Sequence, residues 1–247
     1  MEHLDITLDF ETCALGADAA VIQMAAVAWN RHADYVHDVF TLRCEEGVIN
    51  LSDENGSAYV PETFNFRFDL ADQVFHGRKF SDGTLDFWAN KQKAAVKDGI
   101  LKAEMLPTYN VLYNFAEWVA DLQKQVCAKS VCLWAQGTDF DMSILRHICE
   151  QYAVKIPSNI YKNFRDARTY IMEVGGAVTL TDANEAHRNS NSVYEEINKV
   201  LGEPSFSGCP HDALYDSMLT SRNTWYSMYL MNKFLKLSRI EKQGEQA

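Results

Sequence analysis

A short apolar run in the middle of the chain, followed directly by a helical pattern, constrains the fold most. Residues 130–135 read SVCLWA, and Gly137 bounds the run. Such a run is typical of a buried strand, and the pattern from Asp141 to Val154 predicts a helix. A strand that leads into a helix implies a parallel element, because parallel neighbours need a crossover connection. The chain is therefore expected to have an α/β fold.

The N-terminal third adds strands of another kind. Within residues 4–11, apolar and polar side chains alternate with the period of a strand. Val21–Trp29 is a second apolar run and Val36–Leu42 a third, at the spacing of hairpins. Three strands followed by alternating helix and strand predict a mixed β-sheet flanked by α-helices.

Helices are predicted at three further places. Thr84 resembles an N-cap and Gly99 the far end of one helix. Residues 111–122 carry apolar side chains at the spacing of one helical face. Residues 210–240 begin with proline and predict one or two long closing helices. Aromatic residues of this closing region fit either the core, which is the default, or a homodimer contact: Trp225, Tyr226, Tyr229 and Phe234.

Residues 44–83 are polar and irregular. They contain the turn signals DENG and SDG, and we predict a loop insertion with little regular structure. Elsewhere no linker rich in proline, glycine and serine interrupts the chain. Residues 1–247 are therefore expected to form one domain.

Charge and composition exclude some classes of protein. The formal net charge of −11 argues against a broad basic face that coats nucleic acid, although a small site could still grip one strand end. The N-terminus lacks a secretion signal and no run is long enough to span a bilayer, so we expect a cytoplasmic protein with no membrane partner. Without a secretion signal, and in a chain of this length, we expect the six cysteines to be reduced. None forms a C-x-x-C pair, so we expect no structural zinc site.

Two carboxylates stand close together on the first predicted strand. Asp9 and Glu11 lie two residues apart, so both project from the same face. Two anions there repel each other unless divalent cations bind between them. Taken alone, the pair also fits an exposed polar strand face, and that simpler reading is the commoner one for a D-x-E.

A third carboxylate follows the buried strand. Asp141 lies in WAQGTDFD, at the carboxyl edge of a parallel strand, where α/β sheets usually bind ligands. An acid in the first turn of a helix also complements the helix dipole whatever the function, and Asp139 could serve in that way too.

A histidine and a fourth carboxylate mark the start of the closing helix. His211 and Asp216 occur in HDALYD. A histidine with a pKa near neutrality suits a general base, although a lone histidine is more often structural. At a helix start it lacks the favourable dipole of a helix C-terminus, so another reason for its position is needed.

Three motifs, in this order, resemble those of the DEDDh family of 3′-to-5′ exonucleases: DFET, GTDFD and HDALYD. The chain is also similar to phage exodeoxyribonucleases, exodeoxyribonuclease VIII-like proteins and small bacterial exoribonucleases. The stretches that carry this similarity are AAVIQMAAVAW, LDFWANKQ, QGTDFDMSIL and FRDARTYIME. The resemblance covers most of the chain and is weakest across residues 44–59 and 182–209.

The resemblance implies a ribonuclease H-like fold and hydrolysis with two divalent ions, Mg²⁺ or Mn²⁺. It implies that Asp9 bridges both ions, that Glu11 and Asp216 complete the site of the attacking water, and that Asp141 supports the other site. His211 is implied as the general base, and the product as a nucleoside 5′-monophosphate. Two such ions stabilise the attacking and leaving oxygens, and hard oxygen ligands select magnesium or manganese.

Five further residues are candidates for substrate binding. Phe10 and Thr12 continue the first strand and are expected beside the terminal 3′-hydroxyl, or are a core aromatic and a turn residue. Trp88 could stack on the substrate, but packing on the sheet is the favoured role. Arg165 and Arg168 are candidate phosphate contacts, or surface partners of neighbouring acids.

The expected substrate is the 3′ end of single-stranded nucleic acid, with DNA slightly favoured by the similarity to phage exodeoxyribonucleases. The motifs do not decide the sugar, because that depends on contacts with the 2′-hydroxyl. Three alternatives stay open: an exoribonuclease of the same family, a non-catalytic nucleic-acid-binding scaffold, and a hydrolase of free dinucleotides. The acidic surface mildly favours dinucleotides or short oligonucleotides over long duplex DNA.

Overall fold

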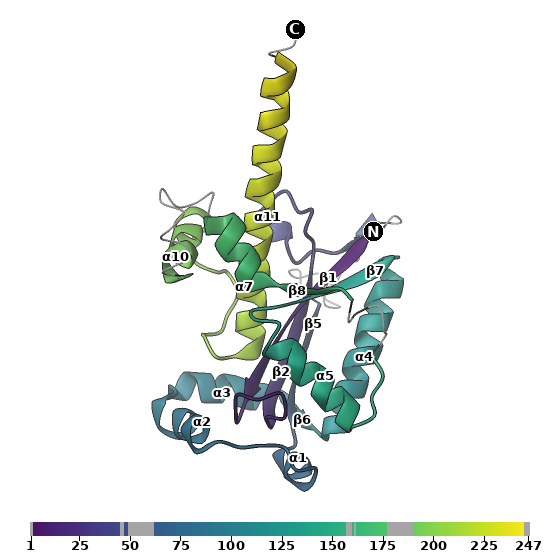
Figure 1. The fold of residues 1–247 in the computed structure, drawn as a ribbon, viewed down its shortest axis with the longest axis vertical. Helices are drawn as coiled ribbons and strands as arrows, with labels where there is room; N and C mark the ends of the chain where they lie inside the picture. Colours follow the sequence, from purple (N-terminus) through teal and green to yellow (C-terminus); the bar gives the residue numbers. More distant parts are fainter. Residues whose placement is uncertain are drawn as a thin grey trace, which may run out of the picture.

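A six-stranded mixed sheet organises the computed structural model of the protein, which describes residues 2–44, 47–48, 62–156, 160, 162–176 and 190–244 (Figure 1). The strands of this sheet are β1 (His3–Thr12), β2 (Val21–Trp29), β5 (Thr63–Phe68), β6 (Glu104–Leu106), β7 (Ser130–Ala135) and β8 (Phe164–Asp166). A separate two-stranded ribbon pairs β3 (Arg43–Cys44) with β4 (Gly47–Val48).

The helices of the described residues lie between and after these strands. They are η1 (Val36–Asp38), α1 (Leu70–Phe75), α2 (Asp82–Asp86), η2 (Phe87–Lys91), α3 (Ala94–Lys102), α4 (Thr108–Gln125), α5 (Asp141–Gln151), α7 (Ala167–Tyr170), η3 (Ile171–Gly175), α10 (Ser190–Leu201) and α11 (Ala213–Gly244).

The strand order is β6-β5-β2-β1-β7-β8. β1 pairs antiparallel with β2, which pairs antiparallel with β5. On its other edge β1 pairs parallel with β7, and β7 pairs parallel with β8. The mixed α/β sheet flanked by helices, as expected of a ribonuclease H-like fold, is therefore confirmed, including the parallel strand at SVCLWA.

Both faces of β1 are buried. Leu4, Ile6 and Leu8 belong to one apolar core, which lies between the sheet and the helices α4 and α5. On the opposite face, α11 contacts β1 and β2, and α10 and η3 pack against α11 (Figure 1). A second core there contains Trp29 and Trp134, whose rings lie 5.8 Å apart. The first strand is thus fixed from both sides.

α11 is one continuous helix and extends well beyond the sheet toward the C-terminus (Figure 1). Trp225 and Tyr226 are buried in the second core, which confirms the default expectation for these two side chains. Phe234 is 61% exposed and lies outside that core. Within the described ranges, no helix combines the length and apolar content that crossing a bilayer requires.

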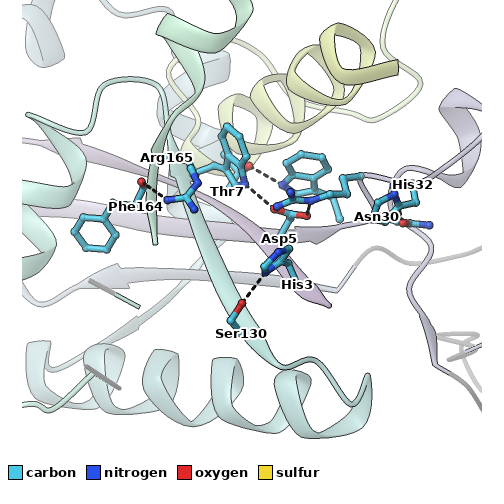
Figure 2. Close-up of polar contacts among 11 residues, drawn as sticks. His3, Asp5, Thr7, Asn30, His32, Ser130, Phe164 and Arg165 are labelled. Atoms are coloured by element: carbon cyan, nitrogen blue, oxygen red, sulfur yellow. Dashed lines mark hydrogen bonds and ion pairs between the residues drawn. The ribbon is translucent and has the colours of Figure 1, made fainter. Parts of the chain in front are cut away.

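A buried ionic cluster fixes the beginning of β1. Asp5 accepts hydrogen bonds from Arg31 Nε at 2.6 Å and from Trp134 Nε1 at 2.7 Å (Figure 2). The neighbouring Trp29 donates its indole N–H to Thr7 Oγ1 at 3.0 Å. These bonds satisfy polar groups that the second core buries, and buried polar groups without partners are costly.

The third predicted strand, Val36–Leu42, is wrong. That segment begins with the 3-10 helix η1 and continues as a loop. Val39 and Leu42 are fully buried, so the apolar pattern records burial and not strand pairing. The strand that pairs with β2 is β5.

β5 and α1 lie inside residues 44–83, so the prediction of little regular structure there is also wrong for this part. Phe64 and Phe68 are buried and lie on the same face of β5, because side chains an even number of residues apart in a strand share a face. Residues 49–61 of the predicted insertion lie outside the described residues.

The predicted helix from Thr84 to Gly99 is two helices. Ser81, not Thr84, is the N-cap of α2, and its hydroxyl accepts from the Thr84 N–H at 3.3 Å. The π-helical turn η2 follows, the backbone is extended at Gln92, and α3 begins at Ala94. Gly99 lies inside α3. The continuous helix at residues 108–125, in contrast, confirms the prediction made from residues 111–122.

Candidate active site

The carboxyl end of β1 carries the first two acids. Asp9 and Glu11 project from the same face of the strand, and Glu11 is 7% exposed. A register shift between Glu11 and Thr12 ends the regular pairing with β2. The two carboxylates therefore lie where the strand leaves the sheet.

The third acid comes from the crossover after β7. Gly137 has a φ of +132°, which a residue with a side chain rarely adopts, and it turns the chain sharply into α5. Asp141 is the first residue of α5 and is 3% exposed. Its Oδ1 accepts the Phe10 N–H at 3.2 Å. This bond ties the acid to β1, beside Asp9.

The fourth acid and the histidine come from the start of α11. The His211 N–H donates to Asp216 Oδ2 at 2.8 Å. His211 has a φ of +69°, an uncommon conformation for a residue with a side chain, and such strain often occurs at functional sites. Its exposed ring packs edge-on against Phe87, with 5.3 Å between ring centroids. Potential ligand atoms of Glu11, His211 and Asp216 all lie within 4.8 Å of one another.

These residues line one open cavity of about 640 Å³. The cavity is lined by Asp9, Phe10, Glu11, Thr12, Leu15, Ser81, Gly83, Thr84, Phe87, Trp88, Gln136, Phe140, Asp141, Arg168, His211 and Asp216. The structure thus brings together the four predicted acids, His211, and four of the five candidate substrate-binding residues.

Thr12 and Trp88 form one wall of this cavity, whereas the side chain of Phe10 belongs to the apolar core that contains Leu4, Ile6 and Leu8. The Trp88 indole N–H donates to the Thr12 carbonyl at 2.8 Å, so the tryptophan is attached to the end of β1 rather than free in solvent. The Thr12 hydroxyl donates to the Ala14 carbonyl at 2.7 Å. Trp88 therefore both packs against the end of β1 and lines the cavity. Its two predicted roles, packing and substrate stacking, are compatible with each other.

The two candidate arginines have different positions. Arg168 is exposed on α7 and lines the cavity. Arg165 does not line it: its guanidinium donates to the Phe164 carbonyl at 3.0 Å and lies near the cluster around Asp5 (Figure 2). Arg165 pairs with Trp134, which pairs with Thr7 of β1, and Arg165 is not among the residues that line the cavity. The structure therefore gives no support to Arg165 as a phosphate contact, and we omit it from the proposed site.

Several lining residues were missed by sequence reasoning. Phe87 belongs to η2, and a π-helical turn of this kind often occurs at functional sites. Gln136 directly follows β7, and its Nε2 atom donates a hydrogen bond to the Tyr194 hydroxyl at 2.8 Å. The position of Gln136 at the carboxyl end of a parallel strand is the one signal that could have identified it.

Burial makes the four acids hard to ionise, and repulsion by the neighbouring acids adds to this effect for Asp9 and Glu11. Burial, and then the charges of Asp141, Glu11 and Asp216, raise the pKa of Asp9 well above its usual range. Burial and the neighbouring charges of Asp216 and Asp141 raise the pKa of Glu11 to about 9. Burial raises the pKa of Asp141 to about 7, against the hydrogen bond from the Phe10 N–H. Burial raises the pKa of Asp216 to about 6, against the hydrogen bond from the His211 N–H.

This donor set fits divalent cations. Packed carboxylates with raised pKa values are stabilised when cations replace the protons, because the cations remove the repulsion. Oxygen ligands favour hard ions such as Mg²⁺ and Mn²⁺. Glu11 and Asp216 lie close enough to share one ion, and His211 lies beside them.

The chain is similar to one family profile, one phage protein and one solved nuclease domain. A profile of the family described as "3′-5′ exoribonuclease Rv2179c-like domain" matches residues 4–226. An exodeoxyribonuclease of Enterobacteria phage T4 is 26% identical over 141 residues, which are 57% of this chain and 53% of the phage protein. The match therefore spans about half the length of that relative. The nuclease domain of 3′hExo, a DEDDh family member solved with rAMP, is 16% identical over 90% of each chain, with a TM-score of 0.48.

Proposed function

Because the chain belongs to the 3′-5′ exoribonuclease Rv2179c-like family, we propose that it removes nucleoside 5′-monophosphates from the 3′ end of single-stranded nucleic acid. The proposed reaction is two-metal-ion hydrolysis with His211 as the general base. The observation that carries the proposal is the convergence of Asp9, Glu11, Asp141 and Asp216 around one cavity, with His211 at its exposed side.

Asp9, Glu11, Asp141 and Asp216 are the residues that would hold the two ions, Mg²⁺ or Mn²⁺. When bound, two such ions stabilise negative charge on the attacking and leaving oxygens of an in-line displacement at phosphorus. The side chains come from β1, α5 and α11, so the packing of the sheet and helices orients them in advance.

His211 accepts the proton of the attacking water in this proposal. Its ring is exposed to the cavity, whereas its backbone N–H is fixed to Asp216. The edge-on contact with Phe87 limits the directions in which the ring can point. A histidine that lines the cavity and is open to solvent can act as a general base and pass the proton on to solvent afterwards.

The substrate is proposed to enter between the wall formed by Thr12 and Trp88 and the cation of Arg168. Arg168 supplies a positive charge to a phosphate, which phosphate contacts in nucleic-acid sites commonly require. The Trp88 ring offers an apolar surface for a base or sugar. Phe10 and Thr12 lie beside the expected position of the terminal 3′-hydroxyl.

RNA is the first substrate to test. The similarity to phage exodeoxyribonucleases slightly favours DNA, and the phage relative is named an exodeoxyribonuclease. The family description names an exoribonuclease, however, and its match covers residues 4–226 rather than half of the chain. This broader match supports RNA, with DNA as the alternative.

A 5′-labelled single strand, prepared as RNA and as DNA, tests the proposal with Mg²⁺, with Mn²⁺ and with chelator. We expect a metal-dependent ladder that shortens from the 3′ end in single-nucleotide steps. Asp9→Asn should abolish it. Asp139→Asn is the matched control, because Asp139 lies in the same GTDFD motif as Asp141 but does not line the cavity. A strand left intact in every metal would favour the non-catalytic scaffold instead.

A further inference from the structure

Gln23 is a buried polar residue next to the site. It lies on β2 directly opposite Glu11 of β1 and is fully buried. A buried amide needs partners for its two N–H donors and for its carbonyl oxygen. The structure provides all three, and two of them come from the segment that carries His211.

The amide of Gln23 connects three parts of the chain. Its Nε2 donates to Asn65 Oδ1 on β5 at 2.9 Å and to Asp212 Oδ1 at 3.1 Å. Its Oε1 accepts the Ala213 N–H at 3.1 Å. One side chain of the sheet therefore holds both a carboxylate and a backbone N–H at the start of α11.

Asp212 is fixed from two further directions. Its Oδ1 also accepts the Leu214 N–H at 3.2 Å, so it caps the first turn of α11. A Cβ atom added to Gly99 of α3 would lie only 2.9 Å from the Oδ2 atom of Asp212. A side chain at Gly99 would thus force Asp212 to rotate away from Gln23 and from the cap.

His211 directly precedes this clamp, which we define as Gln23, Asp212 and Ala213. The backbone of His211 is in the left-handed region, a conformation that persists only where the surroundings enforce it. The hydrogen bond from the His211 N–H to Asp216 holds this backbone conformation from within α11. The clamp enforces it from the sheet.

We propose that Gln23 is a positioning residue that directs His211 into the cavity for the proton transfer of the proposed function, on which this role rests. Gln23 is not among the residues that line the cavity. It acts through residues 212 and 213, and the loss of its bonds changes where the histidine ring points. A misplacement of about 1 Å in a catalytic group can lower the rate by about a hundredfold.

Gln23→Met tests this role, because methionine has a similar length but neither donates nor accepts as the amide does. We expect kcat to fall about tenfold to a hundredfold with KM unchanged. In the His211→Ala background the same substitution should cause no further loss, within about twofold, because the two changes act on one step. Additive losses in the double variant would overturn the proposal.

Gln73→Met is the matched control. Gln73 is also a fully buried glutamine, and its amide bonds to the backbone of Val21 on the same strand, at 2.8 Å from the Val21 N–H and 2.7 Å to the Val21 carbonyl. Neither of these two hydrogen bonds involves α11. We expect a lower melting temperature for both variants, but a lower kcat for Gln23→Met alone. An equal fall in kcat for both would mean that the effect is general distortion of the sheet.

Gly99→Ala provides a second variant if Gln23→Met does not fold. It disturbs Asp212 from the side of α3 and leaves the sheet intact, and alanine is a better helix former than glycine. The same fall in kcat, and the same absence of a further loss with His211→Ala, is expected. Normal kcat in a folded Gly99→Ala protein whose Asp212 has moved would overturn the proposal.

The ring resonances of His211 in NMR spectra provide a readout that does not depend on activity. We expect them to shift in Gln23→Met and to stay in place in Gln73→Met. If the wild-type protein cleaves neither RNA nor DNA, the proposed function fails, while these resonances still show whether Gln23 holds the histidine. Unshifted resonances in Gln23→Met would overturn the positioning role whether or not the protein is a nuclease.

Discussion

Replacing Glu11 by glutamine should stabilise the metal-free protein at neutral pH, whereas most substitutions of buried residues destabilise. Glu11 is 7% exposed, and burial with the charges of Asp216 and Asp141 raises its pKa to about 9. In the unfolded chain the same group has its ordinary pKa of 4.5 and is ionised at pH 7. The carboxylate of Glu11 must therefore take up a proton when the protein folds at pH 7, whereas a glutamine side chain takes up no proton.

The free-energy cost of protonating Glu11 sets the size of the stabilisation expected for Glu11→Gln. Neutral pH lies about 2.5 units above the ordinary pKa, and each unit corresponds to about 1.4 kcal/mol. The wild-type protein thus loses about 3 kcal/mol of unfolding free energy at pH 7 through this one group. In a chain of this length, removing that cost should raise the melting temperature by about 6–12 °C.

The pH dependence has a definite sign. Because the folded pKa is the higher one, the contribution of Glu11 to stability is fully present below the unfolded pKa of 4.5. It is lost as the pH rises through the folded pKa of about 9. In chelator, the wild-type protein should become less stable between these two values, and Glu11→Gln should lose less. The two proteins should differ least near pH 4.

Urea unfolding in chelator at about pH 5, 7 and 8.5 measures this difference as a change in the midpoint. Adding Mg²⁺ should stabilise the wild-type protein more than the variant, because ions that bind only the folded state stabilise it. Glu117→Gln, on the exposed face of α4, is the matched control and should change neither result. Equal stability of wild type and Glu11→Gln at every pH would refute the claim that Glu11 is buried among other carboxylates.

Three further changes test other parts of the structure. His211→Ala should lower kcat by about a hundredfold or more and leave Mn²⁺ affinity, measured by calorimetry, largely intact; an equal loss of affinity would make His211 a ligand. Arg168→Gln should raise KM for an oligonucleotide and reduce the salt dependence of binding, and an unchanged salt slope would argue against a phosphate contact. Asp5→Asn should lower the unfolding free energy by about 3 kcal/mol or more, because it leaves the charge of Arg31 without its buried carboxylate partner. The kcat/KM of the folded variant should stay unchanged. An unchanged urea midpoint would contradict this prediction.

The central elements of the fold were predictable because their patterns report burial on a regular backbone. β1, β2 and β7 are apolar or alternating runs of strand length, and α4 shows one apolar helical face. The apolar pattern wrongly predicted a strand at Val36–Leu42, because Val39 and Leu42 are buried although they belong to a loop. A pattern of apolar residues shows which side chains avoid water, but it does not show where the backbone forms its hydrogen bonds.

The candidate site was predictable to the extent that its residues lie in short motifs. The order of the three motifs along the chain indicated the four acids and His211, and the structure places them around one cavity. Arg165 and Arg168 could not be told apart, because the change from β8 to α7 between them sends one away from the cavity and the other toward it. Gln23 gave no signal, because Asp212 and Ala213 lie about 190 positions later in the chain.

The position of α11 at the end of the described chain has a consequence for synthesis. A nascent chain that has left the ribosome only as far as α10 carries Asp9, Glu11 and Asp141 but lacks His211 and Asp216. It also lacks the helix that covers the face of the sheet formed by Trp29 and Trp134. Premature termination products should therefore be inactive toward nucleic acid and prone to aggregation. The cavity can gain its full lining only after residues 211–216 have been synthesised.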